Sequence, residues 1–100
     1  MSNHTTPVPA VLVATSEDAA PGSFTFEASE KGLFYVCPCG CGATGYLGFR
    51  GRTEPDRPSW EWDGNRTHPT LEPSIRRTLG CKWHGYLHGG VWTPTGDSGQ

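Results

Sequence analysis

The chain has 100 residues and a formal net charge of −2 at pH 7, and hydrophobic residues make up 34 % of it. This length fits one domain, and the near-balanced charge excludes a global electrostatic footprint for nucleic acid or an anionic membrane. No stretch approaches the roughly 20 apolar residues of a membrane span, and the N-terminus lacks the basic segment of a signal peptide. A cytoplasmic protein is therefore expected, with a small core that a metal, disulfides or a partner must reinforce.

Short segments with strand-like patterns follow one another along the first two thirds of the chain. "VPAVLVAT" at 8–15, "SFTFEA" at 23–28, "KGLFYVC" at 31–37 and "ATGYLGF" at 43–49 combine apolar alternation with aromatic residues. The polar segment "RGRTEPDRP" predicts a loop, and "SWEWDGN" predicts a strand that ends in an Asp63-Gly64 turn. The 14 glycines and nine prolines disfavour long helices.

The last third continues this pattern. "HPTLEPSI" carries prolines at 69 and 73, which predict an extended segment that is not a central strand. It is expected to be a strap that closes the sheet, rather than a docking strand for a peptide. "RRTLG" allows one short helical turn, and "GYLHGGVW" predicts a hairpin around Gly89-Gly90. The expected architecture is a mostly β, zinc-ribbon-like domain over 8–93, between a flexible leader at 1–7 and a flexible tail at 94–100.

The cysteines indicate a metal site. Cys37, Cys39 and Cys41 occupy every second position, and Cys81 forms a C-x-x-H pair with His84. Two close groups of ligands separated by a long loop are typical of structural zinc sites, because each group sits on a tight turn. Disulfides are disfavoured, since neighbouring thiols in an extended chain bridge poorly and the expected compartment is reducing. Five candidates compete for four places on one zinc ion, and Cys39 is favoured as the spare.

Four segments together resemble a family of small bacterial and phage proteins. They are "CPCGCG", "PSWEWDGN", "PTLEPSI" and "CKWHGYLHGGVW", within residues 33–92. Phage members of that family often carry the label ammonia monooxygenase, a membrane complex that this chain does not match. Relatives with the CPCGCG form occur beside bacterial ubiquitin-like conjugation genes. The resemblance implies a zinc-binding β-rich fold in a phage or mobile-element setting, and no established reaction.

No catalytic constellation is recognisable by spacing. Glu61, Asp63 and Glu72 are available as general bases, but none follows the pattern of a zinc protease or a zinc deaminase. The chain is therefore expected not to be an enzyme.

The expected function is binding to a protein partner, directed in a phage setting at a host defence complex. Arginine and tryptophan often dominate such interfaces, so the candidate partner-binding residues are Arg50, Arg52, Arg57, Trp60 and Trp62. Two alternatives stay open: a nucleic-acid-binding zinc protein, and an accessory factor or metalloenzyme of a bacterial ubiquitin-like system.

Overall fold

The structure is a computed structural model that describes residues 5–15, 19–54, 56–78 and 80–100. Within these residues the chain forms nine strands: β1 (Val8–Pro9), β2 (Val11–Leu12), β3 (Ser23–Phe26), β4 (Gly32–Val36), β5 (Thr44–Gly48), β6 (Glu61–Trp62), β7 (Leu71–Arg76), β8 (His84–His88) and β9 (Val91–Pro94). The described parts of the chain contain no helix. The prediction of a mostly β domain is confirmed, whereas the short helical turn expected within residues 76–80 is absent from its described positions.

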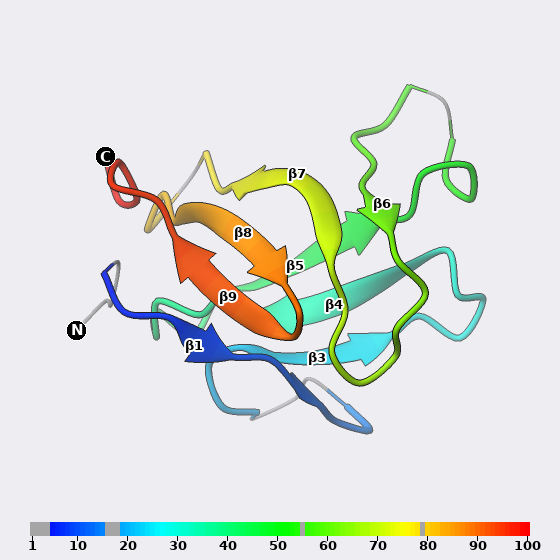
Figure 1. Ribbon diagram of the computed structural model, residues 1–100, viewed down its shortest axis with the longest axis horizontal. Helices are drawn as coiled ribbons and strands as arrows, with labels where there is room; N and C mark the ends of the chain where they lie inside the picture. Colours follow the sequence, from blue (N-terminus) through cyan, green and yellow to red (C-terminus); the bar gives the residue numbers. More distant parts are fainter. Residues whose placement is uncertain (1–4, 16–18, 55, 79) are drawn as a thin grey trace.

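The strands form two sheets that face each other (Figure 1). One sheet has the order β1-β9-β8-β7-β6 and the other has the order β2-β3-β4-β5. Neighbouring strands are antiparallel, except that β2 runs parallel to β3. The predicted hairpin is confirmed: β8 pairs with β9, and both Gly89 and Gly90 have positive φ angles in the turn between them.

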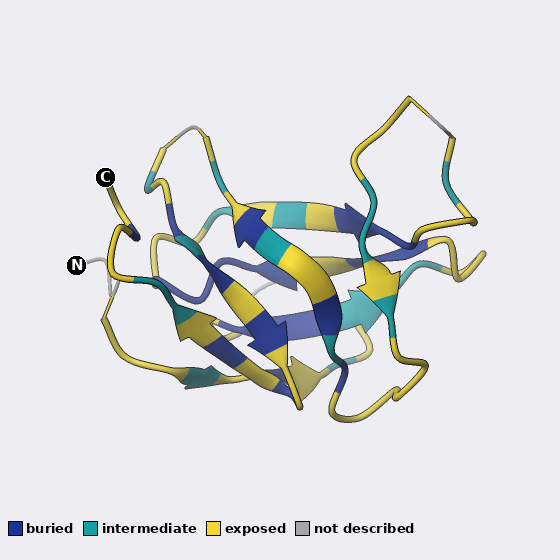
Figure 2. Cartoon of the chain, turned by 45° about the horizontal axis from the view of Figure 1, so that its top comes forward, coloured by how far each residue is buried: buried dark blue, intermediate teal, exposed yellow. Residues whose placement is uncertain are grey.

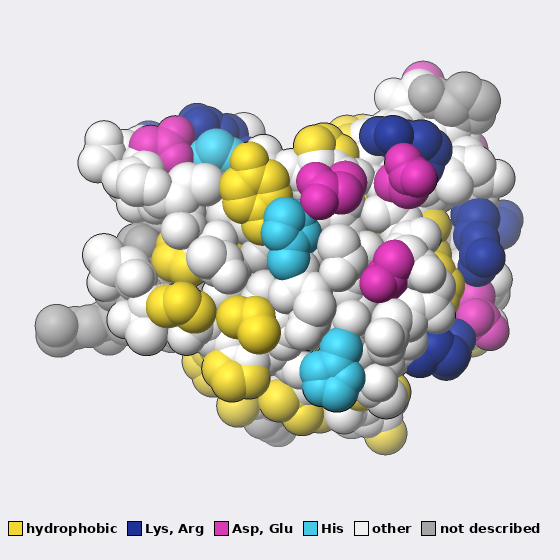
Figure 3. Space-filling model, in the orientation of Figure 1, with side chains coloured by type: hydrophobic (Ala, Val, Ile, Leu, Met, Phe, Trp, Pro, Cys, Tyr) yellow, Lys and Arg dark blue, Asp and Glu magenta, His cyan; other side chains and the backbone are white. Residues whose placement is uncertain are grey.

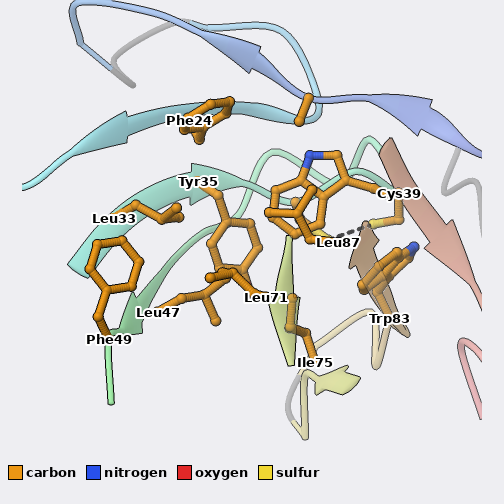
Figure 4. Packing of buried hydrophobic residues seen from close by; sticks show 13 residues of the cluster. Phe24, Leu33, Tyr35, Cys39, Leu47, Phe49, Leu71, Ile75, Trp83 and Leu87 are labelled. Carbon is orange, nitrogen blue, oxygen red and sulfur yellow. Dashed lines mark hydrogen bonds between the residues drawn. The ribbon is translucent and has the colours of Figure 1, made fainter. Parts of the chain in front are cut away.

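The core lies between the sheets and is dominated by large side chains. Trp83 and Trp92 meet edge to face with ring centroids 5.9 Å apart, and Phe24, Leu33 and Leu87 are fully buried around them. Figure 4 shows these side chains pointing toward one another from both sheets. In β8 and β9, alternate residues face the core and the residues between them face outward (Figure 2).

This alternation defines the outer face of β8. Gly85 and Leu87 are buried, whereas Tyr86 and His88 are exposed and His84 is half-buried. Gly85 is required because a Cβ atom there would collide with the Thr93 carbonyl oxygen and with the ring of Trp83. The sequence "HGYLH" therefore directs three ring-bearing side chains to one solvent-facing surface.

The position of β7 corrects the expectation for "HPTLEPSI". This strand lies between β8 and β6 in the sheet, not at its edge. Its pairing with β8 is irregular between Leu71 and Ile75, and this irregular stretch contains Pro73. A proline is tolerated there because a bulge already interrupts the ladder of hydrogen bonds. Because β6 pairs only with Leu71 and Glu72, no strand within the described residues pairs with the second half of β7 on that side.

Residues 94–100, expected to form a flexible tail, lie against the start of β8 (Figure 1). The backbone N–H of His84 donates to Ser98 Oγ at 3.0 Å, and Gly99 N–H donates to the Lys82 carbonyl at 2.8 Å. Ser98 is buried. The C-terminal segment is thus part of the folded domain and lies beside the outer face of β7 and β8. Of the expected leader, residues 1–4 lie outside the described residues, and 5–7 are exposed.

Candidate active site and cysteine cluster

The structure brings four of the five predicted metal ligands together. The sulfur atoms of Cys37, Cys39, Cys41 and Cys81 all lie within 4.8 Å of one another. Cys37 Sγ lies 3.3 Å from Cys39 Sγ and 3.4 Å from Cys81 Sγ. Four thiolates around a tetrahedral zinc ion lie about 3.8 Å apart, since each Zn–S bond is about 2.3 Å. The four thiols are therefore close enough together to bind one metal ion.

Tight turns build this cluster. Cys37 follows β4, and the next two cysteines lie on a turn in which Gly40 and Gly42 have positive φ angles. Cys81 lies between Gly80 and Lys82, which also have positive φ angles. These backbone conformations fold two separate segments so that their thiols converge.

The thiols differ in how readily they ionise. Burial raises the pKa of Cys37 and of Cys39. Burial also opposes ionisation of Cys81, but the backbone N–H of Trp83 and hydrogen bonds from the other thiols together lower its pKa to about 6. The cluster therefore loses its first proton most readily at Cys81, which favours metal binding near neutral pH.

His84, the fifth predicted ligand, lies outside this group. Its imidazole forms contacts with a serine and an aspartate instead of the thiols. Cys39, favoured as the spare thiol, is a member of the group. The sequence thus predicts that the cysteines cluster. In the structure the cluster consists of four cysteines, and His84 belongs to a different site.

That second site is a chain of three side chains. His84 Nε2 lies 3.1 Å from Ser74 Oγ, and His84 Nδ1 lies 2.8 Å from Asp97 Oδ1. Serine, histidine and aspartate in this order are the arrangement in which an imidazole withdraws a proton from a hydroxyl while a carboxylate orients the ring. The roles are recognised by geometry, because unrelated triads occur in different orders along their chains.

Three adjacent segments supply these groups. Ser74 lies on β7 in its irregular stretch, His84 begins β8, and Asp97 follows β9. Antiparallel pairing places Arg76 opposite His84, which brings the second half of β7 against the start of β8. The triad therefore results from sheet register and from the docking of the C-terminal segment.

Further contacts hold the triad in place. Arg76 donates a hydrogen bond to Asp97 Oδ2 at 2.8 Å, and the Thr95 hydroxyl donates to Asp97 Oδ1. The hydrogen bonds from Thr95 and then from His84 hold the pKa of Asp97 at about 2, below its ordinary value of 3.8. The Trp60 indole N–H donates to the Ser74 carbonyl oxygen at 3.2 Å. Asp97 is therefore ionised at neutral pH, as the orienting group of a triad must be.

The site faces solvent on the outer surface of the larger sheet. Ser74 is half-buried, the His84 side chain is 16 % exposed, and that of Asp97 is 50 % exposed. Figure 3 shows histidine, acidic and basic side chains gathered on the surface over β7, β8 and β9. A carbonyl compound can thus approach Ser74 from outside, where the arrangement is able to perform acyl transfer.

Sequence reasoning did not find this site. Ser74 was expected in a structural strap, His84 at a metal and Asp97 in a loose tail. A serine, a histidine and an aspartate at 74, 84 and 97 form no recognised motif by spacing. The one available signal was that His84 is a surplus ligand for a four-coordinate metal.

Each of the five residues expected to bind a partner makes contacts within the chain. Arg52 lies over the Trp62 ring, 5.6 Å from its centroid, and Trp62 is stacked on Phe49. Arg50 contacts Glu61, Arg57 contacts Glu54 and lines the same pocket as Arg52, and the Trp60 indole donates to the Ser74 carbonyl. Their role in partner binding stays a prediction.

Searching the described residues reveals no helix of the length and apolarity that a membrane crossing requires. Searches of curated proteins and of solved structures found no match. A family model described as "Bacterial ubiquitination-like system serine protease (BubE)" matches residues 12–95. This description overturns the expectation that the chain is not an enzyme, and it agrees with the resemblance to relatives near ubiquitin-like conjugation genes. Because the match covers most of the sequence, the chain belongs to the BubE family.

Proposed function

We propose that this protein is a serine hydrolase of a bacterial ubiquitin-like system, with Ser74 as nucleophile. The observation that carries the proposal is the continuous Ser74–His84–Asp97 contact chain, with distances of 3.1 and 2.8 Å. The family description supplies the setting and names a serine protease. The substrate is an ester or amide at the end of a ubiquitin-like protein, and the protein partner expected from the sequence is this substrate.

The reaction proceeds in two steps. Ser74 Oγ attacks the carbonyl carbon, and its proton passes to His84 Nε2, which then donates it to the leaving oxygen or nitrogen. Water next attacks the acyl-enzyme and gives a proton to the same nitrogen, which passes it to Ser74 Oγ as the ester bond breaks and the carboxylic acid leaves. Asp97 keeps Nδ1 protonated and balances the charge of the imidazolium. Arg76 and Thr95 are positioning residues that hold the Asp97 carboxylate.

We also propose that the four cysteines bind one zinc ion in a structural role. Four thiolates are typical of closed structural sites, and they leave no open position for a substrate. In the proposed reaction the zinc stabilises the fold that positions the triad and takes no part in acyl transfer. Elemental analysis of protein purified without added metal should find about one zinc per chain. Metal-free protein that is fully folded would contradict this role.

The hydrolase proposal is tested with a small activated ester, whose hydrolysis depends little on contacts outside the triad. Purified protein should hydrolyse p-nitrophenyl acetate, and Ser74→Ala should lower the rate by about 10³-fold or more. Ser29→Ala is the matched control, because Ser29 is exposed and lies on a turn outside the triad. Cleavage of a ubiquitin-like protein with a C-terminal extension should show the same dependence. Equal activity of Ser74→Ala and wild type would contradict the proposal.

A further inference from the structure

A groove lies next to the triad, between the exposed edges of two strands. It encloses about 330 Å³, and its lining includes residues of β5 and the second half of β7. The edge of β5 is open over Thr44–Leu47 because β5 is the last strand of the smaller sheet. Beyond Glu72 no strand of the described residues pairs with this edge of β7, because β6 begins opposite Glu72. Figure 2 shows the two strands as neighbours from different sheets.

Backbone groups on both edges point into this groove. The Arg77 N–H donates to the Trp83 carbonyl, so the main-chain N–H and C=O groups of Arg77 point toward β8. Those of Arg76 point to the other side of β7, because consecutive residues of a strand direct their main-chain groups to opposite sides. On β5 the same alternation applies: the Ala43 carbonyl accepts from Cys37 N–H, so Thr44 and Tyr46 face away from β4. The groove thus presents main-chain donors and acceptors on both walls.

The groove is linked to the nucleophile's strand through Trp60. Trp60 lines the groove, its backbone N–H donates to the Gly48 carbonyl, and its indole N–H donates to the Ser74 carbonyl. Trp60 therefore bridges the two edges and blocks a chain from continuing straight past it. Arg76 and Ser74 are two residues apart, which is about 7 Å along a strand. Ser74 does not itself line the groove, but a peptide extended along Arg76 toward Trp60 would approach it.

The charges of the lining limit what the groove accepts. Its arginines are Arg76 and Arg77, and its described lining contains no carboxylate. Arg76 is paired with Asp97, and the Arg77 guanidinium donates to the Tyr35 hydroxyl at 3.0 Å and to the Thr44 carbonyl at 3.5 Å. A lining with two arginines and no carboxylate among its described residues disfavours a basic peptide and favours a neutral or acidic one.

From these observations we infer that the groove binds the substrate as an added β-strand. The occupant is an extended, neutral or acidic peptide segment whose main chain bonds to Thr44 and Tyr46 on one side and to Arg76 on the other. Strand addition of this kind gives affinity through the main chain. The segment ends at Trp60, and its terminal carbonyl reaches Ser74. This inference rests on the proposed function, because it assigns the substrate-binding part of the same site.

The first test compares two substrates on one variant. Thr44→Pro removes a main-chain donor from the groove wall and leaves the β4 pairing intact, because that N–H faces away from β4. The rate of p-nitrophenyl acetate hydrolysis by this variant is measured beside that of a peptide substrate, because the small ester does not extend along the groove. The variant's kcat/KM for acetyl-Val-Glu-Val-Gly-aminomethylcoumarin should fall about five- to tenfold, the effect of one lost hydrogen bond. Equal losses for both substrates, or no loss for the peptide, would overturn the inference.

A second test leaves the protein unchanged. Wild-type protein should hydrolyse a peptide with N-methylated backbone amides at least fivefold more slowly, and a peptide with Lys in place of Glu more slowly than its parent. Equal rates for the N-methylated and parent peptides would overturn strand addition.

A third measurement separates the groove from the chemistry. Ser74→Ala protein is titrated with the uncleavable acetyl-Val-Glu-Val-Gly amide, and amide chemical shifts are followed. Shifts concentrated at Thr44, Tyr46, Arg76 and Thr78 support the groove even where wild-type protein hydrolyses nothing. Hydrolysis without such shifts contradicts the groove and leaves the hydrolase proposal standing.

Discussion

Individual side chains at this site are tied to one another by short polar contacts. His84 holds both of its ring nitrogens in contact, one with Ser74 and the other with Asp97. Asp97 is the most exposed of the three, so it depends on Arg76 and Thr95 to stay in place. The hydroxyl, imidazole and carboxylate therefore act as one unit, and loss of any one should impair the reaction more than its own contacts suggest.

The first prediction concerns the ionisation of Asp97. Its pKa in the folded protein is about 2, below the usual 3.8, so deprotonation favours the native state. That stabilisation is fully present above about pH 4 and is lost as pH falls through about 2. The melting temperature of wild type should exceed that of Asp97→Asn at pH 5, and the difference should shrink by pH 2. A difference that stays constant across this range would contradict the assignment.

At the scale of the elements, β7 carries the nucleophile and also forms part of the groove proposed to bind the substrate. Its first half is paired on both sides, and its irregular middle places Ser74 beside β8. Its second half supplies one wall of the groove. Trp60 connects the loop before β6 to this strand through the Ser74 carbonyl. A single strand thus positions the nucleophile and the substrate.

The second prediction isolates the contact between Trp60 and Ser74. Trp60→Phe removes the indole N–H and should lower kcat several-fold, while costing about 1 kcal/mol of stability. Trp62→Phe is the matched control, because its indole N–H donates to Asn65, away from the triad. Kinetics and thermal melting of both variants provide the comparison. Equal kcat values for the two variants would show that the Trp60 contact does not position Ser74.

The strands illustrate what local patterns reveal and what they miss. The Gly89-Gly90 hairpin follows from turn chemistry and the mostly β class from apolar alternation. The prediction that β7 would not be a central strand was wrong, because the rule against proline in central strands does not take account of a bulge at Pro73. The triad was missed because it depends on register between β7 and β8 and on docking of Asp97, neither of which is encoded by local spacing.

At the scale of the whole molecule, the cysteine cluster lies close to the catalytic segments along the chain. Cys81 precedes His84 by three residues, and the backbone of Arg77 is bonded to that of Trp83. The cluster joins the end of β4 to the start of β8, so it connects the smaller sheet with the larger one. A metal bound there would stabilise the relative placement of the groove walls and the triad.

The third prediction is that metal and activity are lost together. Binding of a structural zinc is worth about 10–16 kcal/mol in small peptides, more than the stability of most small domains. Cys81→Ser should therefore lose zinc, melt at a much lower temperature and lose hydrolysis of p-nitrophenyl acetate. His88→Ala is the control, because the ion-pair partner of His88 is Glu72 on the outer face of the sheet and not a cysteine. Full activity of Cys81→Ser without zinc would contradict this coupling.

The central claim is that Ser74 is an activated nucleophile, and covalent labelling tests it most directly. A fluorophosphonate reacts with a serine that is activated by a neighbouring base. Wild-type protein should take up one label per chain, and peptide mass spectrometry should locate it at Ser74. His84→Ala should abolish labelling, while Ser29→Ala should leave it unchanged. Absence of a label on the folded wild-type protein, or a label on another residue, would contradict the account.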